Sequence, residues 1–171
     1  MSTTTSLDEL NAMPVEDFTA RLADIFEHSP WVAERAAVAR PFASVGALHD
    51  AMCSAMRKAN RDEQLALIRA HPQLAGKAAM RGELTEASTS EQSGAGLDQC
   101  SAEEFARITE LNDAYQQRFG FPFILAVRGH DRTGIIANMA ARVANAPEVE
   151  FDEALRQIER IAALRLKDCA V

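Results

Sequence analysis

Apolar residues recur along most of this chain at spacings of three and four, the period of an amphipathic helix. The clearest stripe follows Pro14, which suits the first turn of a helix, and consists of Val15, Phe18, Leu22, Ile25 and Phe26. Similar stripes predict further helices over about 31–39, 44–60, 62–70, 101–119, 133–145 and from 152 onward. No partner strands are visible, so the pattern predicts an all-α fold, a single compact helical domain of about seven to nine helices.

Several of these predicted helices carry end signals. Ser44, Thr133 and Asp152 each stand where an N-cap side chain is expected. The sequence Ser101-x-x-Glu104 has the spacing of a capping box, in which two side chains bind backbone N–H groups reciprocally. Gly120 follows the last apolar residue of the same helix, where a left-handed glycine often ends a helix.

Two stretches break the helical pattern. His71–Leu97 reads HPQLAGKAAMRGELTEASTSEQSGAGL and holds four of the chain's eight glycines. Such a long polar stretch inside a compact domain is more often functional than a simple connector. The second, FPFILAV at 121–127, is short and apolar, and it is bracketed by Gly120 and Gly129. We expect it to be an extended, buried segment that belongs to no sheet.

The length and net charge of the chain limit the number of domains and the kinds of partner that are expected. A chain of 171 residues predicts one domain over 1–171, with short flexible tails at 1–5 and 168–171. The formal net charge of −7 argues against nucleic acid or an anionic membrane surface as the partner. No apolar run is long enough for a transmembrane helix. An anionic metabolite would therefore need a few basic groups gathered in one place.

The cysteines and the two chain termini predict the cellular compartment of the protein. Cys53, Cys100 and Cys169 are odd in number and widely spaced, which fits reduced thiols better than disulfides or a zinc site. The first residues have neither a basic nor an apolar signal segment, and the last residues do not match a peroxisomal signal. We therefore expect a cytoplasmic protein of a prokaryote.

The polar stretch offers two candidate catalytic residues. His71 lies at the end of a predicted helix and before Pro72, where an imidazole could titrate near neutral pH as a general acid or base. From the spacing alone, a purely structural C-capping role is the more common one at such a position. Glu91 has two interpretations as well, because Ser88-x-x-Glu91 matches a capping box. Gln92 beside it favours a polar pocket wall over a core.

Arg165 is the third unusual residue. It lies four residues after Ile161 and seven after Ile158, on the apolar stripe of the last predicted helix. A cation there needs a buried or half-buried anionic partner, which could be a ligand or a structural carboxylate. Alternatively, its side chain reaches the solvent at the helix end. The sequence contains no metal-binding or nucleotide-binding motif, so no metal or cofactor is predicted.

Four motifs give the chain a family resemblance: HPQLAGKAA, ELTEASTSEQSGAGL, FGFPFILAVRG and IERIAALRL. From about Met13 to Leu166 the chain resembles the 2-oxo-4-hydroxy-4-carboxy-5-ureidoimidazoline (OHCU) decarboxylases of uric acid degradation. The resemblance implies a carboxy-lyase that converts OHCU to (S)-allantoin without a metal or organic cofactor, in an all-α homodimer. It implies that His71 and Glu91 are catalytic. The implied substrate-binding residues are Pro72, Ser88, Gln92, Phe121, Phe123, Ile124 and Arg165.

Two other functions remain open from the sequence. The chain could be a non-enzymatic helical interaction module, with His71–Leu97 as a docking segment. It could also be an enzyme of the same fold that acts on a related ureido or purine-derived substrate. The module predicts an exposed apolar patch without a small-molecule pocket, whereas both enzymes require a polar pocket.

Overall fold

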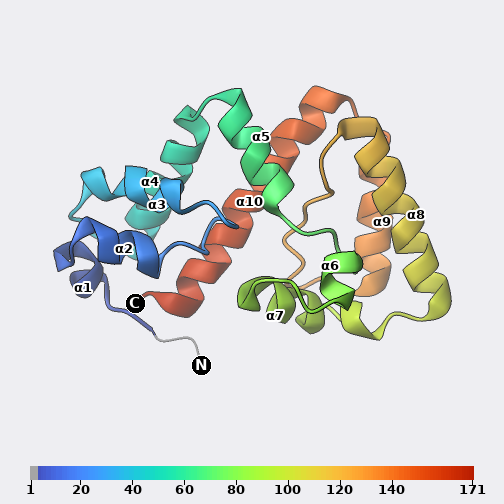
Figure 1. Ribbon diagram of the computed structural model, residues 1–171, viewed down its shortest axis with the longest axis horizontal. Coiled ribbons are helices and arrows are strands. Elements are labelled where there is room, and N and C mark those ends of the chain that lie inside the picture. Colours follow the sequence, from blue (N-terminus) through green and yellow to red (C-terminus); the bar gives the residue numbers. More distant parts are fainter. Residues whose placement is uncertain (1–3) are drawn as a thin grey trace. The chain divides into compact units, whose positions relative to one another are not determined.

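The computed structural model describes residues 4–171, apart from the side chain of Ala78, and it is built from helices (Figure 1). The elements are α1 (Leu7–Ala12), α2 (Val15–Arg21), α3 (Pro30–Ala36), η1 (Ala37–Ala39), α4 (Val45–Lys58), α5 (Arg61–Ala70), α6 (Lys77–Met80), α7 (Glu86–Gly94), η2 (Leu97–Gln99), α8 (Ala102–Phe119), α9 (Arg132–Arg142) and α10 (Pro147–Cys169). Within residues 4–171 the strand-like pairing is limited to an isolated parallel bridge between Thr5 and Ala170. The predicted all-α fold is confirmed.

The chain divides into two compact units. The first unit consists of Met1–Ala70 and Glu159–Val171, and the second unit is His71–Ile158. Helix α10 supplies its first half to the second unit and its second half to the first. The predicted single domain over 1–171 stays a prediction, because this division concerns compactness and not independent folding.

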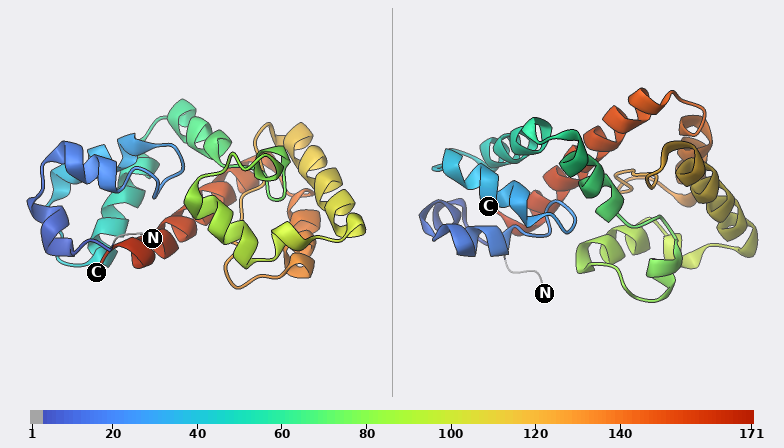
Figure 2. Two further views of the ribbon diagram at one scale, coloured as in Figure 1. Left: turned by 60° about the horizontal axis from the view of Figure 1, so that its bottom comes forward. Right: turned by 45° about the horizontal axis from the view of Figure 1, so that its top comes forward.

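The first unit is organised around α3 and α4, which lie side by side, with α2 packed against α3 (Figure 2). The predicted cap of α4 is confirmed, since the Ser44 hydroxyl accepts a hydrogen bond from the Ala47 N–H at 3.0 Å. Burying a large apolar side chain such as Leu, Ile, Phe or Met stabilises the folded state by about 1.5–3 kcal/mol. The core of this unit includes Leu10, Phe18, Phe26, Val32, Leu48, Met52, Met56, Leu67, Ile68 and Leu166.

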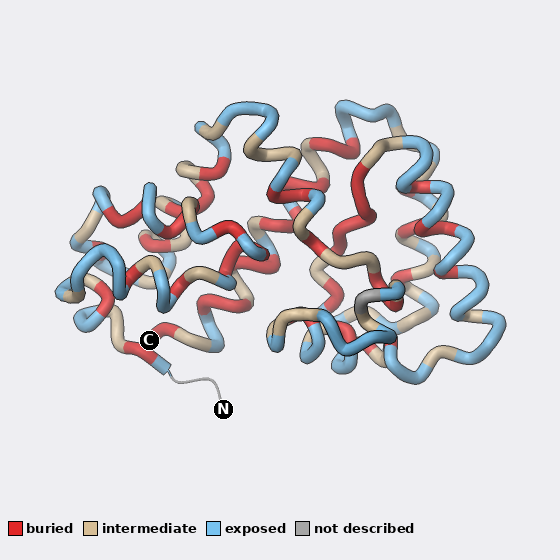
Figure 3. Tube along the Cα trace, in the orientation of Figure 1, coloured by how far each residue is buried: buried red, intermediate tan, exposed pale blue. Residues whose placement is uncertain are grey.

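In the second unit, α8 and α9 pack against each other (Figure 1). The predicted capping box of α8 is confirmed: Glu104 N–H donates to the Ser101 hydroxyl at 3.1 Å, and Ser101 N–H donates to the Glu104 carboxylate at 2.9 Å. Gly120 ends α8 in the left-handed conformation, with φ 78°, as predicted. The chain then continues as the extended, largely buried segment between α8 and α9, red in Figure 3.

Three predicted helix boundaries were wrong. Helix α9 is capped by Asp131, whose carboxylate accepts from the Gly134 N–H at 2.7 Å, and not by Thr133. Asp131 lies earlier in the chain and is itself a strong N-cap residue. Helix α10 begins at Pro147 instead of after Asp152, because proline is compatible with a first helical turn. Helix α2 ends at Arg21, although apolar residues continue to Phe26.

The ends of the chain also differ from the predicted tails. Helix α10 continues to Cys169, and the Thr5 N–H donates to the Cys169 carbonyl at 2.9 Å. Val171 exchanges backbone hydrogen bonds with this segment, receiving one from Leu7 at 2.7 Å and donating one to Thr5 at 3.1 Å. Residues 1–3 of the predicted tail lie outside the described residues. Backbone pairing of this kind leaves no side-chain pattern, so it could not be predicted from the sequence.

The two longest helices have amphipathic sequences. Helix α10 has 23 residues and α8 has 18, and both carry charged residues along their length. Across residues 4–171, no helix combines the length and the apolar character that crossing a bilayer requires.

Candidate active site

His71 follows directly after α5, which ends at Ala70. Its side chain is buried, with 6% of its surface exposed, whereas Pro72 is half-buried. Proline has no backbone N–H and disfavours the helical conformation of the residue before it. The His-Pro pair therefore stops the helix and begins a loop that leads to α6.

Helix α7 carries Ser88, Glu91 and Gln92, but it begins earlier than the capping-box interpretation required. Thr85 is its N-cap, and the Thr85 hydroxyl accepts from the Ser88 N–H at 3.2 Å. Ser88 and Gln92 are both buried one turn apart, and Glu91 is half-buried. Because Ser88 and Glu91 lie inside the helix, the proposed capping box between them was wrong. The catalytic role of Glu91 stays a prediction.

Gln92 joins α7 to the loop that follows His71. Its side-chain oxygen accepts from the Ala75 N–H at 2.9 Å, and its side-chain nitrogen donates to the Gln73 carbonyl at 3.3 Å. These two bonds hold the segment that carries His71 against the helix that carries Glu91. Both ends of the Gln92 amide are therefore engaged by the protein, and its contact with substrate stays a prediction.

The tight turn at Gly76 supports a first testable prediction. A Cβ atom at Gly76 would lie 2.9 Å from the Gln73 Cβ and 3.3 Å from the Gln73 carbonyl oxygen. We expect Gly76→Ala to lower the free energy of unfolding by about 1–3 kcal/mol, as overpacking does. Chemical denaturation measures it. Gly94→Ala is the matched control, because a Cβ there meets nothing within 4 Å. Equal stability of the two variants would contradict the prediction.

A second side chain holds the same loop and was missed by the sequence analysis. Asn112 on α8 is buried and donates from its side-chain nitrogen to the Leu74 carbonyl at 2.9 Å. The signal was present in the sequence, since Asn112 lies four residues after Ile108 and directly beside Leu111, within an apolar stripe. A polar residue at such a position predicts a buried hydrogen bond.

The predicted extended segment at 121–127 is confirmed. Phe121, Phe123 and Ile124 are all buried, with 4% or less of their surfaces exposed. Tyr115 on α8 presents its ring to Phe121 and Phe123, with ring centroids 5.9 Å and 5.4 Å apart and nearly perpendicular planes. Since Asn112 and Tyr115 lie one turn apart on α8, the same helix contacts this segment and the loop after His71.

Arg142, at the end of α9, fixes the backbone of the 121–124 segment. Its guanidinium donates to the Ile124 carbonyl at 2.7 Å and to the Glu150 carboxylate at 2.8 Å. The same group lies over the Phe123 ring, 4.3 Å from its centroid. Glu150 has no exposed surface and the Arg142 side chain is 10% exposed, so this ion pair is buried.

Two further side chains donate hydrogen bonds to the Glu150 carboxylate. The Tyr115 hydroxyl donates to one carboxylate oxygen at 2.7 Å, and the Asn145 side chain donates to the other at 2.9 Å. Burial, followed by the hydrogen bond to Glu150, raises the pKa of Tyr115 above its usual range. The phenol therefore keeps its proton and acts as a donor.

Arg165 belongs to the first unit, where it contacts a buried carboxylate. Its guanidinium lies 2.8 Å from the Glu27 carboxylate and donates to the Asp24 carbonyl at 2.8 Å. Glu27 is 1% exposed and Arg165 is 6% exposed. The expected buried anionic partner is confirmed, and it is a carboxylate of the chain. Substrate binding by Arg165 stays a prediction.

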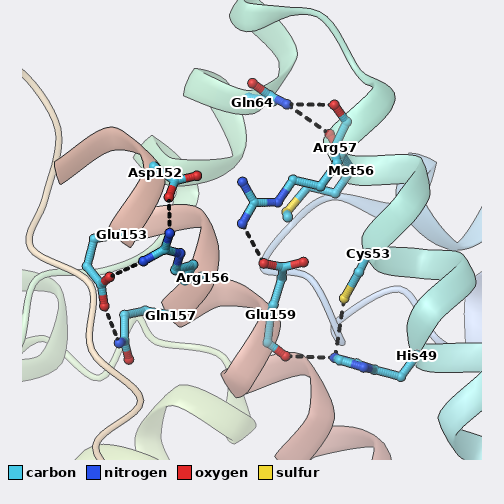
Figure 4. A network of polar contacts seen from close by, with 10 residues as sticks. All are labelled: His49, Cys53, Met56, Arg57, Gln64, Asp152, Glu153, Arg156, Gln157 and Glu159. Carbon is cyan, nitrogen blue, oxygen red and sulfur yellow. Dashed lines mark hydrogen bonds and ion pairs between the residues drawn. The ribbon is translucent and has the colours of Figure 1, made fainter. Parts of the chain in front are cut away.

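A histidine and a cysteine also meet in the first unit, but they do not form a nucleophilic pair (Figure 4). The Cys53 sulfur lies 3.3 Å from His49 Nε2, and the same nitrogen lies 2.8 Å from the Glu159 carbonyl. A carbonyl only accepts, so Nε2 carries a proton and is no base for the thiol. Burial, and then the Glu159 carboxylate, raises the pKa of Cys53 to about 12.

This raised pKa predicts slow chemistry at Cys53. The thiolate is the reactive form, so we expect native Cys53 to react with iodoacetamide at about pH 8 roughly 10³-fold more slowly than an unfolded thiol. Timed alkylation followed by peptide mass spectrometry measures the rate, with the urea-unfolded chain as the control. Native and unfolded rates that agree would contradict the structure.

A groove of about 570 Å³ also opens in the second unit. Its polar wall includes Thr89, Gln92 and Ser93, and its apolar wall includes Leu84 and Phe105. Neither catalytic candidate, His71 nor Glu91, lines it. Among the residues that the structure describes, no three His, Cys, Asp or Glu side chains come together as metal ligands would.

Comparison with known proteins identifies the family. The family model described as OHCU decarboxylase matches residues 11–167, which is nearly the whole chain. The chain belongs to the OHCU decarboxylase family. The family resemblance inferred from the four motifs is thereby confirmed.

Individual relatives are similar over most of this chain. The 2-oxo-4-hydroxy-4-carboxy-5-ureidoimidazoline decarboxylase of Haloferax volcanii is 42% identical over 163 residues, which cover 95% of each chain. The crystal structure of an (S)-allantoin synthase is 30% identical, with a TM-score of 0.75, over 96% of this chain and 54% of that one. An OHCU decarboxylase crystallised in the presence of (S)-allantoin has a TM-score of 0.70 over 85% of this chain and 94% of that one. At 23% identity, this last likeness supports the all-α fold alone.

Proposed function

We propose that this chain is a carboxy-lyase that decarboxylates OHCU to (S)-allantoin in uric acid degradation, with His71 and Glu91 as its catalytic pair. Family membership over residues 11–167 carries the activity. The observation that supports the pair is the double hydrogen bond of Gln92, which holds the loop after His71 against the helix of Glu91. A proton-transfer site requires this kind of rigid support.

The substrate itself supplies the electron sink for the reaction. The carboxylate is attached to C4, next to the C5=N double bond of the ring. When the bond to the carboxylate breaks, carbon dioxide leaves, its electron pair forms C4=C5, and the ring nitrogen takes a proton. The C4 hydroxyl then gives up its proton to form C4=O, and C5 takes a proton on one face. This last step sets the (S) configuration.

The two proposed catalytic residues have different roles in this series of reaction steps. His71 is proposed to accept the hydroxyl proton, because an imidazole can exchange protons near neutral pH. Glu91 orients the imidazole or binds the ureido N–H groups, which a carboxylate accepts well. One of the two, directly or through water, returns the proton to C5. The protein thus contributes positioning and proton transfer. The conjugated ring of the substrate accepts the electron pair of the breaking C–C bond.

The remaining predicted residues would bind the substrate. Pro72, Ser88 and Gln92 are proposed to contact the ring and the ureido group. The backbone and side chains of 121–124 are proposed to line the pocket, supported by the rigid hold of Arg142 on the Ile124 carbonyl. Arg165 is proposed to bind developing negative charge on the substrate oxygens, as a preorganised cation does.

The assembly and location of the protein are proposed from the same resemblance. We expect a homodimer in the cytoplasm, with OHCU and (S)-allantoin as its small-molecule partners and no nucleic acid or membrane. Sedimentation equilibrium at micromolar concentration measures the assembly. A mass twice that of the chain supports the dimer, and the mass of a single chain would contradict it.

Ligand binding separates the enzyme from the interaction module. A ligand that binds only the folded state stabilises it, by about 2.7 kcal/mol at a hundred times its Kd. We expect (S)-allantoin to raise the melting temperature more than (R)-allantoin, because the site forms one enantiomer. A thermal-shift series with both enantiomers measures this. No shift with either would favour the module.

A further inference from the structure

The loop between His71 and α6 is held in a conformation that its sequence does not favour. Ala75 has φ 50°, in the left-handed region that residues with a Cβ atom rarely adopt. The peptide group that precedes this strained residue is bonded to two buried side-chain amides, the Ala75 N–H to Gln92 and the Leu74 carbonyl to Asn112. Strained residues persist where the surrounding structure over-determines them, and they gather at functional sites.

Asn112 is a buried polar residue whose side-chain amide is satisfied at one end. It is 4% exposed, and its side-chain nitrogen donates to the Leu74 carbonyl. Its side-chain oxygen is buried and has no hydrogen-bond donor among residues 4–171. A buried acceptor without a donor carries its desolvation cost uncompensated. The bond to Leu74 satisfies a buried carbonyl of the loop and ties the loop to α8.

We propose that Asn112 is a positioning residue for the decarboxylation, which acts through the 73–75 loop to fix the placement of His71. The helix that carries Asn112 also packs Tyr115 on Phe121 and Phe123, so it is a rigid base for the loop. Without the Asn112 bond, the left-handed Ala75 relaxes and the three-residue connection to His71 shifts with it. A misplacement of a catalytic group by about 1 Å can cost 10²-fold in rate. This role rests on the proposed function of His71.

The test replaces Asn112 and compares it with a matched asparagine. Asn112→Leu keeps the side-chain size and removes the donor to Leu74. Asn11→Leu is the control, because Asn11 clamps a loop of the first unit through the Phe42 carbonyl at 2.9 Å and the Phe42 N–H at 2.8 Å. Should Asn112→Leu not fold, Asn112→Ala replaces it, since the smaller side chain admits a water to the Leu74 carbonyl.

Two readouts distinguish positioning from a general loss of stability. At a temperature where every variant is folded, we expect kcat for OHCU to fall by about 10- to 10²-fold in the Asn112 variant, with a smaller change in KM. The His71 imidazole resonance, assigned by its loss in His71→Gln, is expected to move in the Asn112 variant and not in Asn11→Leu. An unmoved resonance or a wild-type kcat would overturn the proposal. If wild-type protein does not turn over OHCU, the proposed function fails, and the resonance still tests the positioning.

Discussion

Replacing His71 by glutamine is expected to lower kcat/KM for OHCU by about 10²–10⁴-fold, the usual effect of losing a general acid or base. The imidazole is buried at the start of the strained loop, so glutamine keeps the polarity and most of the volume of the side chain without its titration. Initial rates by absorbance measure the loss. His130→Gln is the control, since this histidine lies in the loop before α9 and is assigned no catalytic role.

The same experiment applies to the other member of the pair. Glu91→Gln removes the charge of a half-buried carboxylate on α7, and Glu86→Gln removes the charge of an exposed carboxylate on the same helix. We expect a loss comparable to that of His71→Gln for the first and a near-normal rate for the second. If all four variants turn over OHCU at similar rates, His71 and Glu91 are not the catalytic pair.

The second large effect concerns stability. Glu150→Ala is expected to lower the free energy of unfolding by about 3–5 kcal/mol, because it leaves the buried Arg142 guanidinium without its carboxylate. Urea denaturation measures the change. Asp152→Ala is the matched control two residues along, since its ion pair with Arg156 is exposed and such pairs contribute at most about 1 kcal/mol.

A double variant separates the effect of the unpaired Arg142 charge from the effect of a misplaced 121–124 segment. Replacing both members, as in Glu150→Leu with Arg142→Met, removes the uncompensated charge and should recover much of the lost stability. The Ile124 carbonyl nevertheless loses its donor, so the 121–124 segment should remain misplaced and kcat/KM low. Loss of stability in Glu150→Ala no greater than in Asp152→Ala would show that the buried pair does not hold this unit together.

Local sequence patterns predicted most of the fold. Apolar periodicity located the long helices, and the capping box of Ser101 and Glu104 formed as expected because its interactions span four residues. The wrong helix starts came from choosing between neighbouring residues that can each cap a helix. Asp131 and Thr133 can both cap a helix, and the backbone accepts only one start. The chain ends were missed since their pairing joins residues at opposite ends of the sequence.

The candidate site was only partly predictable for the same reason. His71, Glu91 and Arg165 are unusual within their own local sequences, so each could be singled out. Their supporting contacts are not local: Arg165 meets Glu27, and Asn112 meets Leu74, across 138 and 38 positions respectively. Periodicity alone does not identify which buried polar residues meet. The structure supplied these contacts, and family membership supplied the reaction.

The stereochemistry and rate of product formation provide the decisive test of the proposed decarboxylation. OHCU is generated from urate with urate oxidase and hydroxyisourate hydrolase, this protein is added, and circular dichroism follows the product. We expect an (S)-allantoin signal that appears faster than the spontaneous racemic product and that is lost with His71→Gln. Formation of allantoin at the spontaneous rate, without a dichroic signal, would contradict it.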